Sequence, residues 1–297
     1  MKLTKKYWIS TDEGIPIETR TILNEYLLSI KLANKAETTI SRYRSILERF
    51  FLECLIPISE LTSEDVLKWL QAYSVGKKER TLDQVISTLS SFFNFCLLED
   101  YLDTVVIKQR WRPKIPQSLP KYLAEQEYAR VKRTAEGLST RDRALVLLLF
   151  SSGCRRFEVA QLTIQDVDFN RRTVIVKGKG KKIRHAHFSE ECAFVLKDYL
   201  QTRSVDPTEP LFLNKFGQPL QQSAIYAVIK KVGRKAGLRQ SLHPHVCRHT
   251  FATNMLSKGA DLEFIADEMG HSNLNTTRVY ARIPAEDIIS AYQNKME

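Results

Sequence analysis

The sequence of 297 residues predicts a mainly α-helical protein, with a helical N-terminal domain followed by a mostly helical second domain that contains a small β-hairpin. Three observations predict this class. Apolar residues recur at helical spacing on both sides of residues 108–120. That segment holds three prolines, so it cannot continue a helix. One stretch after it carries the strand, turn and strand pattern of a hairpin.

The first domain is predicted over residues 1–107, with a short leader at 1–16. Apolar residues three and four positions apart predict four helices, in blocks at 22–30, 40–51, 66–73 and 82–96. Thr62 followed by Asp65 resembles a capping box, which predicts the start of the third helix. The aromatic residues of these blocks keep the helical period, so we expect them in the core rather than stacked on bases.

Residues 108–120 are predicted to be an extended linker. The segment contains four basic residues and no acidic one. A solvated spacer is one interpretation, but a spacer needs no excess of cations, and the interleaved Trp111 favours a strap along a phosphate backbone. The candidate DNA contacts of the linker are Lys108, Arg110, Arg112 and Lys114.

The net charge of +11 is unevenly distributed along the chain. Residues 1–107 hold 13 Lys and Arg against 15 Asp and Glu, the linker 4 against 0, and residues 121–297 hold 28 against 19. A basic chain favours a polyanionic partner, and nucleic acid is the first candidate. The N-terminal domain must then contact DNA through a local basic face, for which the candidates are Lys31, Lys35, Arg42 and Arg44.

The location of the protein is predicted to be cytoplasmic, and at the nucleoid when it is bound to DNA. The longest apolar run, 144–150, is far shorter than a membrane span, and acidic residues interrupt the N-terminus before a signal-peptide core can develop. The five cysteines are widely spaced and form no C-x-x-C pair, which predicts reduced thiols in or near the core.

The second domain, 121–297, is predicted to contain a hairpin with strands at 173–176 and 183–188. Its tip carries four lysines, of which Lys177, Lys179 and Lys181 are candidate DNA contacts, although a solvated flexible turn is a strong alternative because Gly/Lys turns are common. Glycines on both sides of Lys179 would let that ammonium approach a ligand closely. Apolar residues at helical spacing predict a C-terminal tail helix at 284–297, docked on its own domain or on a neighbouring protomer.

Polar residues also stand where a helical core would not require them. Arg155 follows the apolar helix that ends near Phe150, so it needs an anion, which is either Glu158 or a phosphate. Pro244 is suited to a first helical turn, which places His245, Arg248 and His249 on one face of a helix. Gly270 predicts a helix end directly before His271, and Tyr280 follows.

Together these groups suit metal-free phosphoryl transfer through a tyrosine. Guanidinium groups bind phosphate oxygens, a lysine can protonate a leaving alkoxide, and a histidine can move the proton of a phenol. The sequence shows no acidic cluster for magnesium and no P-loop spacing, and His185 with His187 lacks a third metal ligand. We therefore expect no metal and no other cofactor.

At these residues the chain resembles the tyrosine recombinase (phage integrase-like) family, in the motifs at 153–155, 178–180, 245–248, 270–271 and 280. The resemblance implies a core-binding DNA-binding domain, a linker and a catalytic domain. It implies that Tyr280 is the nucleophile, that Lys179 is the general acid and that His245 is the acid/base partner of Tyr280. It further implies that Arg155, Arg248 and His271 bind the phosphate and that Glu158 supports Arg155.

The resemblance implies site-specific recombination through a 3′-phosphotyrosyl link and a Holliday junction. The partners would be double-stranded DNA with paired sites and a homo-tetramer, with a related recombinase as a further partner. The short leader favours an Xer-like or a transposon or plasmid resolvase-like member. Two alternatives stay open, a non-catalytic sequence-specific DNA-binding protein and a monomeric type IB-like topoisomerase.

Overall fold

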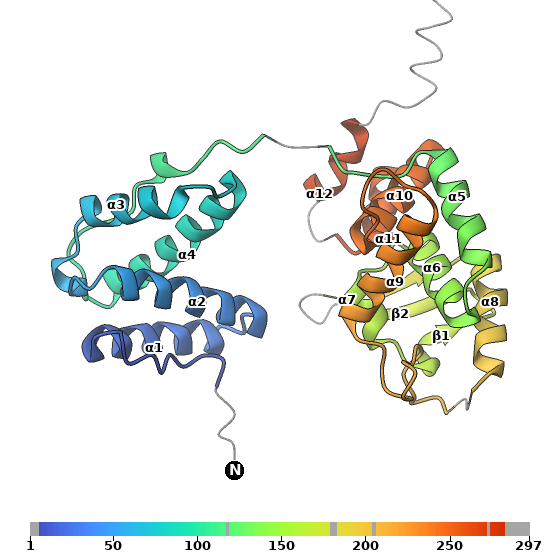
Figure 1. The fold of residues 1–297 in the computed structure, drawn as a ribbon, viewed down its shortest axis with the longest axis horizontal. Helices are drawn as coiled ribbons and strands as arrows, with labels where there is room; N and C mark the ends of the chain where they lie inside the picture. Colours follow the sequence, from blue (N-terminus) through green and yellow to red (C-terminus); the bar gives the residue numbers. More distant parts are fainter. Residues whose placement is uncertain (1–5, 117–118, 179–182, 204–205, 272–273, 283–297) are drawn as a thin grey trace, which may run out of the picture. The chain divides into compact units, whose positions relative to one another are not determined.

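The computed structural model describes residues 6–116, 119–178, 183–203, 206–271 and 274–282. The chain divides into two compact units, Met1–Gln117 and Ser118–Glu297 (Figure 1). Each unit has its own hydrophobic core. The mainly helical class with one small sheet agrees with the class predicted from the sequence.

The described residues of the first unit form four α-helices, in the four predicted places. They are α1 (Ile17–Leu32), α2 (Glu37–Glu53), α3 (Ser63–Ser74) and α4 (Glu79–Leu98). The predicted capping box at the start of α3 is confirmed, since Thr62 Oγ1 accepts from the backbone N–H of Asp65 and the backbone N–H of Thr62 donates to Asp65 Oδ2, at 3.3 and 3.1 Å. Aromatic residues such as Phe50 and Phe92 are fully buried between these helices, as expected.

The segment after α4 differs from the predicted linker. Residues up to Arg112 fold against the first unit, because Val106 and Ile107 are buried and Trp111, in a 3₁₀ turn (Gln109–Trp111), packs on its core. Arg112 Nη1 donates to Asp83 and Ser87 of α4, at 3.0 and 2.8 Å. The prolines that predicted an extended chain all come after this point, so they could not prevent the packing.

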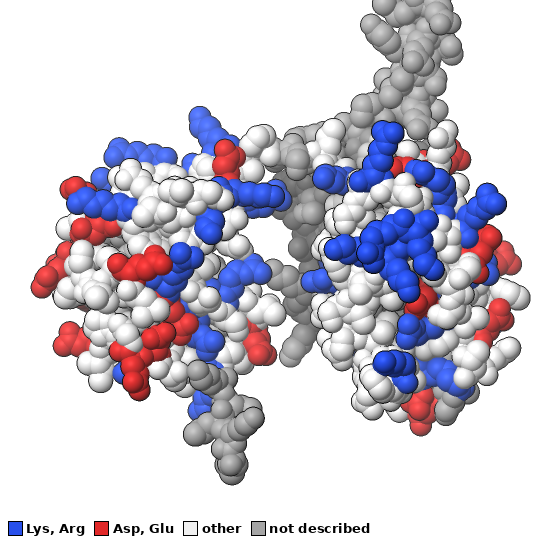
Figure 2. Space-filling model, viewed as in Figure 1, with Lys and Arg blue, Asp and Glu red and all other residues white. Residues whose placement is uncertain are grey.

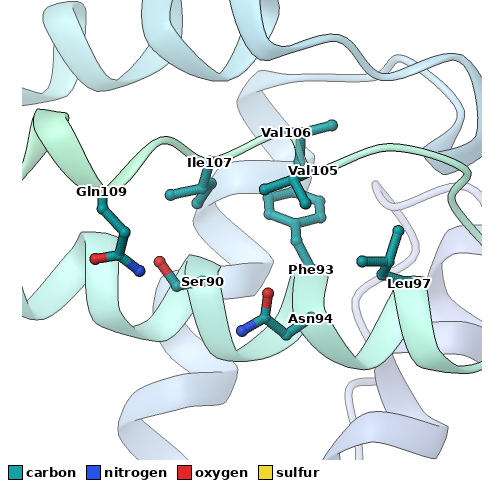
Figure 3. Close-up of a pocket in the computed structure, with 8 residues that line it drawn as sticks. All are labelled: Ser90, Phe93, Asn94, Leu97, Val105, Val106, Ile107 and Gln109. Atoms are coloured by element: carbon teal, nitrogen blue, oxygen red, sulfur yellow. The ribbon is translucent and has the colours of Figure 1, made fainter.

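A cavity of about 100 Å³ lies between α4 and this segment (Figure 3). Its lining residues are Ser90, Phe93, Asn94, Leu97, Val105, Val106, Ile107 and Gln109. Binding sites for small molecules usually enclose at least about 300 Å³, so this cavity has room for water rather than for a substrate.

The second unit contains the remaining helices and the sheet. The helices are α5 (Glu125–Glu136), α6 (Thr140–Ser152), α7 (Arg156–Gln161), α8 (Glu190–Gln201), α9 (Gln222–Lys235), α10 (Pro244–Ser257), α11 (Leu262–Met269) and α12 (Asn275–Arg278). Short 3₁₀ turns lie at Ile164–Asp166 and Tyr280–Arg282 in this unit. Another lies at Ile58–Glu60 in the first unit. In Figure 1 the orange and red helices α10, α11 and α12 lie together on one side of the unit.

The antiparallel sheet has the order β1-β2-β3, formed by β1 (Val167–Asp168), β2 (Thr173–Lys177) and β3 (Ile183–His187). The predicted hairpin is β2 and β3, in a register that pairs Thr173 with His187 and Lys177 with Ile183. The short strand β1 was not predicted, because two residues are too few to show an alternating pattern.

Helix α6 lies at the centre of the second unit, and all its residues from Ala144 to Phe150 are buried. It packs against α8 and α10, so the sides of the helix are covered by protein. The five cysteines are buried and unpaired, as expected from their spacing. Within the described part of the chain, no helix is long and apolar enough to cross a membrane.

Candidate active site

The end of α6 places the first arginine of the site. Gly153 ends the helix in the left-handed region at φ 59°, and a Cβ at this position would lie 2.5 Å from the ring of Phe251. Only glycine satisfies both conditions without strain. The chain then turns away from the core, so that Arg155 is the N-cap of α7 and its side chain is 26% exposed.

Glu158 is one of the two anions that the sequence suggested as partners of Arg155, and the structure pairs it with this arginine. Its carboxylate, fully buried, accepts from the backbone N–H of Arg155 at 2.7 Å and from Arg155 Nη1 at 2.9 Å. Arg184 on β3 donates to both oxygens of the same carboxylate. Burial alone would raise the pKa of Glu158, but the hydrogen bonds and charge of Arg184, followed by those of Arg155, hold this pKa below its ordinary value.

Arg248 lies deeper than Arg155, with 4% of its surface exposed. Helix α10 begins at Pro244, as predicted, and carries Arg248 one turn later. The guanidinium donates to the carbonyl of Gly153 at 2.5 Å and to that of Met269 at 2.7 Å. Burial, together with the charge of Arg155, lowers the pKa of Arg248 to about 10, so the group stays protonated at neutral pH.

The end of α11 brings a third group to the two arginines. Gly270 ends the helix in the left-handed region at φ 63°, as predicted. The carbonyls of Met269 and Gly270 accept from Arg155 at 3.3 and 3.1 Å. His271 follows directly, and its Nδ1 lies 2.7 Å from Oγ1 of Thr277. The arginine pair and His271 are thus held around the same turn of backbone.

Tyr280 is buried, with 2% of its surface exposed, among Phe251, Ala252, Ile265 and Met269. Its hydroxyl lies 2.7 Å from Nδ1 of His249, one residue after Arg248. Burial raises the pKa of Tyr280 to about 12, although the charge of Arg248 opposes this shift. The tyrosine is therefore protonated and covered by protein in this structure.

His245, which was expected to be the acid/base partner of Tyr280, is more exposed than His249 and lies in the first turn of α10. Partial desolvation and the nearby positive charges lower its pKa. The hydroxyl of Tyr280 meets His249 in this structure, so the phenol is not paired with His245 here.

Several candidate residues lie elsewhere. Lys177 is exposed at the end of β2, while Lys179, Lys181 and the predicted tail helix 284–297 lie outside the described residues. In the first unit, Lys35 and Arg42 are exposed. Lys31 lies over the ring of Trp8, at 3.2 Å from its centroid, and Arg44 donates to the carbonyls of Lys6 and Ile9.

The four linker candidates also differ from one another. Lys108, Arg110 and Lys114 are exposed. Arg112 forms an ion pair with Asp83, so its charge is already neutralised by protein. Arg44 and Arg112 therefore have structural contacts that the sequence did not indicate.

Two residues at the cluster were missed in the sequence, Arg184 and Glu268. Arg184 Nε donates to the carbonyl of Glu268 at 2.9 Å, and the Glu268 carboxylate accepts from the backbone of His187 and lies 2.8 Å from its Nδ1. Alternation along β3 was the available signal, because Arg184 and Ala186 point inward while Ile183, His185 and His187 are exposed. Glu268 likewise shares a helical face with Ile265 and Met269, which are buried.

The chemistry available here is the binding of an anion by fixed cations. Arg155, Arg248 and Arg184 lie around Glu158 and the end of α11, so the site has more positive than negative charge. In the described part of the chain, no group of three or more His, Cys, Asp or Glu side chains is placed to hold a metal ion. His187, one of the two histidines considered as metal ligands, is paired with Glu268.

Acid should destabilise this site. Burial, and then neighbouring positive charges, lower the pKa of both His249 and His271 to about 4. The unfolded chain therefore binds more protons than the folded chain between about pH 6.5 and pH 4, so stability is lost as the pH falls through this range. Because both rings are only partly buried and solvent screens their charge, we expect roughly 1–2 kcal/mol from each imidazole, measured as the change in the free energy of unfolding in urea between these two pH values.

The variants His249→Gln and His271→Gln should each flatten this pH dependence, with His185→Gln, at an exposed position of β3, as the matched control. If the three variants and the unmodified protein lose the same stability on acidification, the burial of these two imidazoles does not carry the effect.

Comparison with known families matches both units. The model of the phage integrase family matches residues 121–286, and that of the phage integrase N-terminal SAM-like domain matches residues 23–100. Together the two matches cover most of the chain, and the first includes the whole arginine, histidine and tyrosine cluster.

Relatives of similar length are also found. The chain is 36% identical over 277 residues to tyrosine recombinase XerA of Pyrococcus horikoshii, and this alignment covers 92% of each of the two chains. It is similar to a crystal structure of XerA recombinase, with 29% identity, a TM-score of 0.54 and coverage of 94% of this chain and 99% of that one. The fold is shared with XerH bound to palindromic difH substrate, with 23% identity, a TM-score of 0.75 and coverage of 97% and 92%.

Proposed function

Because the chain belongs to the phage integrase family, the tyrosine recombinases, we propose that it is an Xer-type site-specific recombinase in which Tyr280 cuts and rejoins DNA strands. The observation that supports this most directly is one cluster in which Arg155 and Arg248 both donate to the end of α11, His271 follows that end, and Tyr280 lies against His249 on α10. A DNA-binding protein without activity would have no use for this arrangement, and a monomeric topoisomerase is not favoured by the Xer relatives.

The proposed cleavage step is an in-line transfer. The oxygen of Tyr280 bonds to the scissile phosphorus, the bond from phosphorus to the 5′-oxygen breaks, and a 3′-phosphotyrosine and a free 5′-hydroxyl form. The phenol proton passes to a histidine, and Lys179 supplies a proton to the departing oxygen. Rejoining is the reverse attack by a 5′-hydroxyl. The link to tyrosine conserves the energy of the phosphodiester, so the step requires no nucleotide.

Arg155 and Arg248 would stabilise the pentavalent phosphate, with His271 as a further hydrogen-bond donor. Both guanidiniums are held by backbone carbonyls and, for Arg155, by Glu158, so their positions are fixed before DNA binds. Such preorganisation is what lets a charged group stabilise a transition state at little reorganisation cost.

Tyr280 must move before it can react. A hydroxyl that is covered by protein and paired with His249 cannot reach a phosphorus atom on DNA. We therefore infer that this buried position is a resting arrangement of the proposed nucleophile, and that binding of the recombination site exposes the phenol. In the active arrangement, His245 or His249 would accept its proton.

The proposed partner is double-stranded DNA with paired recombination sites. Figure 2 shows Lys and Arg side chains gathered on the visible face of the second unit, whereas both signs of charge are mixed on the first. Helix α9 alone carries four exposed cations, Lys230, Lys231, Arg234 and Lys235. We propose a homo-tetramer on two DNA duplexes, with cytoplasmic and nucleoid location following from this substrate. The first unit would be the core-binding domain and 121–297 the catalytic domain.

A nicked suicide substrate that carries the cognate site tests this function. The nick lets a short fragment diffuse away after cleavage, so the covalent intermediate accumulates and is seen as a band of lower mobility in denaturing gels. Tyrosine recombination predicts this adduct and, with intact paired sites, Holliday junctions. DNA binding without an adduct would leave the binding protein, and an adduct with relaxation but without junctions would leave the topoisomerase.

DNA affinity should depend strongly on salt. If about eight phosphates are contacted by Lys and Arg, the logarithm of the binding constant should fall against that of the salt concentration with a slope of roughly −7. Fluorescence anisotropy of a labelled site over a series of KCl concentrations measures this slope. A slope near zero would exclude binding through the basic surface.

A further inference from the structure

We propose that Arg184, on the strand that returns from the hairpin tip, is a positioning residue for Arg155 and thereby for the scissile phosphate. This inference rests on the proposed function, since it assigns a role within the same reaction. Arg184 is not one of the residues that the family motifs indicated, and its contacts identify the acceptors of its side chain.

The first contact is with the carboxylate that supports Arg155. Arg184 Nη1 and Nη2 donate to Oε1 and Oε2 of Glu158, at 2.9 and 3.0 Å, in a bidentate pair. Oε1 also accepts from Arg155 Nη1 at 2.9 Å, and Oε2 from the backbone of Arg155 at 2.7 Å. Each oxygen of the buried carboxylate is therefore shared by the two arginines, and Arg184 fixes the plane in which Glu158 holds Arg155.

The second contact is with the helix end that carries His271. Arg184 Nε donates to the carbonyl of Glu268, while Met269 and Gly270 in the same turn accept from Arg248 and Arg155. Gly270 also approaches Arg184 closely, since a Cβ there would lie 2.9 Å from the Arg184 Cδ. One side chain thus joins strand β3, the start of α7 and the end of α11.

Arg184 does not itself face a substrate. Its side chain is 13% exposed, and Nε, Nη1 and Nη2 all have protein acceptors. Arg155, by contrast, is 26% exposed. Without Arg184, the buried carboxylate of Glu158 keeps Arg155 as its single cationic side-chain partner. We then expect the carboxylate and the Arg155 guanidinium to shift from their present positions. A displacement of about 1 Å in a group that contacts the reacting atoms can lower a rate about 100-fold.

The test uses single-turnover cleavage of the nicked suicide substrate by the full-length protein. Arg184→Met should lower the cleavage rate about 100-fold with little change in DNA affinity. Arg184→Lys, which keeps the charge but not the fork, should recover only part of this loss. Arg203→Met is the matched control, because Arg203 is also a mostly buried arginine that pairs with a carboxylate, Glu209, and with the carbonyls of Pro210 and Leu211.

Modified substrates show which group Arg184 acts through. A methylphosphonate at the scissile position removes the charge of one non-bridging oxygen, so a defect that acts through Arg155 should shrink to about 10-fold or less. The loss should also be smaller in an Arg155→Lys background than in the unmodified protein. A 5′-bridging phosphorothiolate, whose leaving thiolate needs no proton, should leave the defect unchanged, because it bypasses only a general acid.

Four results would overturn the inference: equal rates for Arg184→Met and Arg203→Met, additive losses with Arg155→Lys, rescue by the phosphorothiolate, or an equal loss in His187→Ala. The last variant removes the side-chain contact of His187 with the Glu268 carboxylate but leaves the backbone contact of His187 and the Arg184–Glu158 pair intact. If the unmodified protein forms no adduct at all, the proposed function fails instead, and that result is seen before any variant is compared.

Discussion

Replacing Tyr280 by phenylalanine should abolish the covalent DNA adduct, with a loss in cleavage rate of about 10⁴-fold or more. No other group can take the place of the phenol oxygen, because the link to phosphorus is made by that atom. The ring itself is retained, so its packing against Phe251, Ile265 and Met269 should survive. Incubation with the nicked suicide substrate, followed by a denaturing gel, measures the adduct.

The control for this variant is Tyr199→Phe. Tyr199 is also a nearly buried tyrosine of the second unit, and its hydroxyl accepts from the backbone of Leu213 at 3.1 Å. Each substitution removes one hydrogen bond, at a cost of about 1 kcal/mol in stability. The two variants should therefore unfold alike, but only Tyr199→Phe should form the adduct. An adduct that persists in Tyr280→Phe would assign the nucleophile to another residue.

The sequence predicted the helices of the first unit well, because their cores follow a simple period. The blocks around Ile40 and Phe92 keep the helical spacing through several turns, and Thr62 with Asp65 gives the start of α3 by a local rule. The structure of residues 108–112 was not predicted in this way. It depends on the packing of Val106, Ile107 and Trp111 against the core of the first unit. That packing is a tertiary contact, and the local pattern of residues 108–120 does not show it.

At the candidate site, the sequence identified the groups and the pair of Arg155 with Glu158, but not the other pairings. Arg155, Arg248 and His271 were found by motif, and the structure places them around the last turn of α11. The pairing of Tyr280 with His249 rather than His245 depends on the depth at which two helical neighbours lie, four residues apart on α10. A spacing of four puts both on one face, so periodicity alone cannot distinguish them.

Arg184 shows the same limit for charged residues. Its inward position could be read from the alternation along β3, but an inward arginine has value only when its acceptors are known. Those acceptors, Glu158 and Glu268, are 26 and 84 residues away in sequence. Long-range polar networks of this kind leave no local period, so they require coordinates.

Arg248→Met should reduce the cleavage rate by about 10³-fold, the second largest effect expected here. Arg248 is the more deeply buried of the two proposed phosphate-binding arginines, and its positive charge lies where solvent screens it least. DNA affinity should change little, since binding rests on many surface cations, so the loss should fall on the single-turnover rate at saturating DNA. The methionine fills similar space, which limits collapse of the core.

The variant Arg248→Lys distinguishes the role of the guanidinium geometry from that of the positive charge. Arg248 uses two nitrogens on the carbonyls of Gly153 and Met269, and its fork has further N–H groups that can bind phosphate at the same time. A lysine has one nitrogen, so in Arg248→Lys the ammonium must serve either the carbonyls or the phosphate. Arg248→Lys should therefore stay at least about tenfold below the unmodified protein although the charge is kept. If Arg248→Lys cleaves at the full rate, a positive charge alone is enough for catalysis at this position. If the cleavage rate of Arg248→Met falls no more than that of Arg203→Met, Arg248 serves only to stabilise the fold.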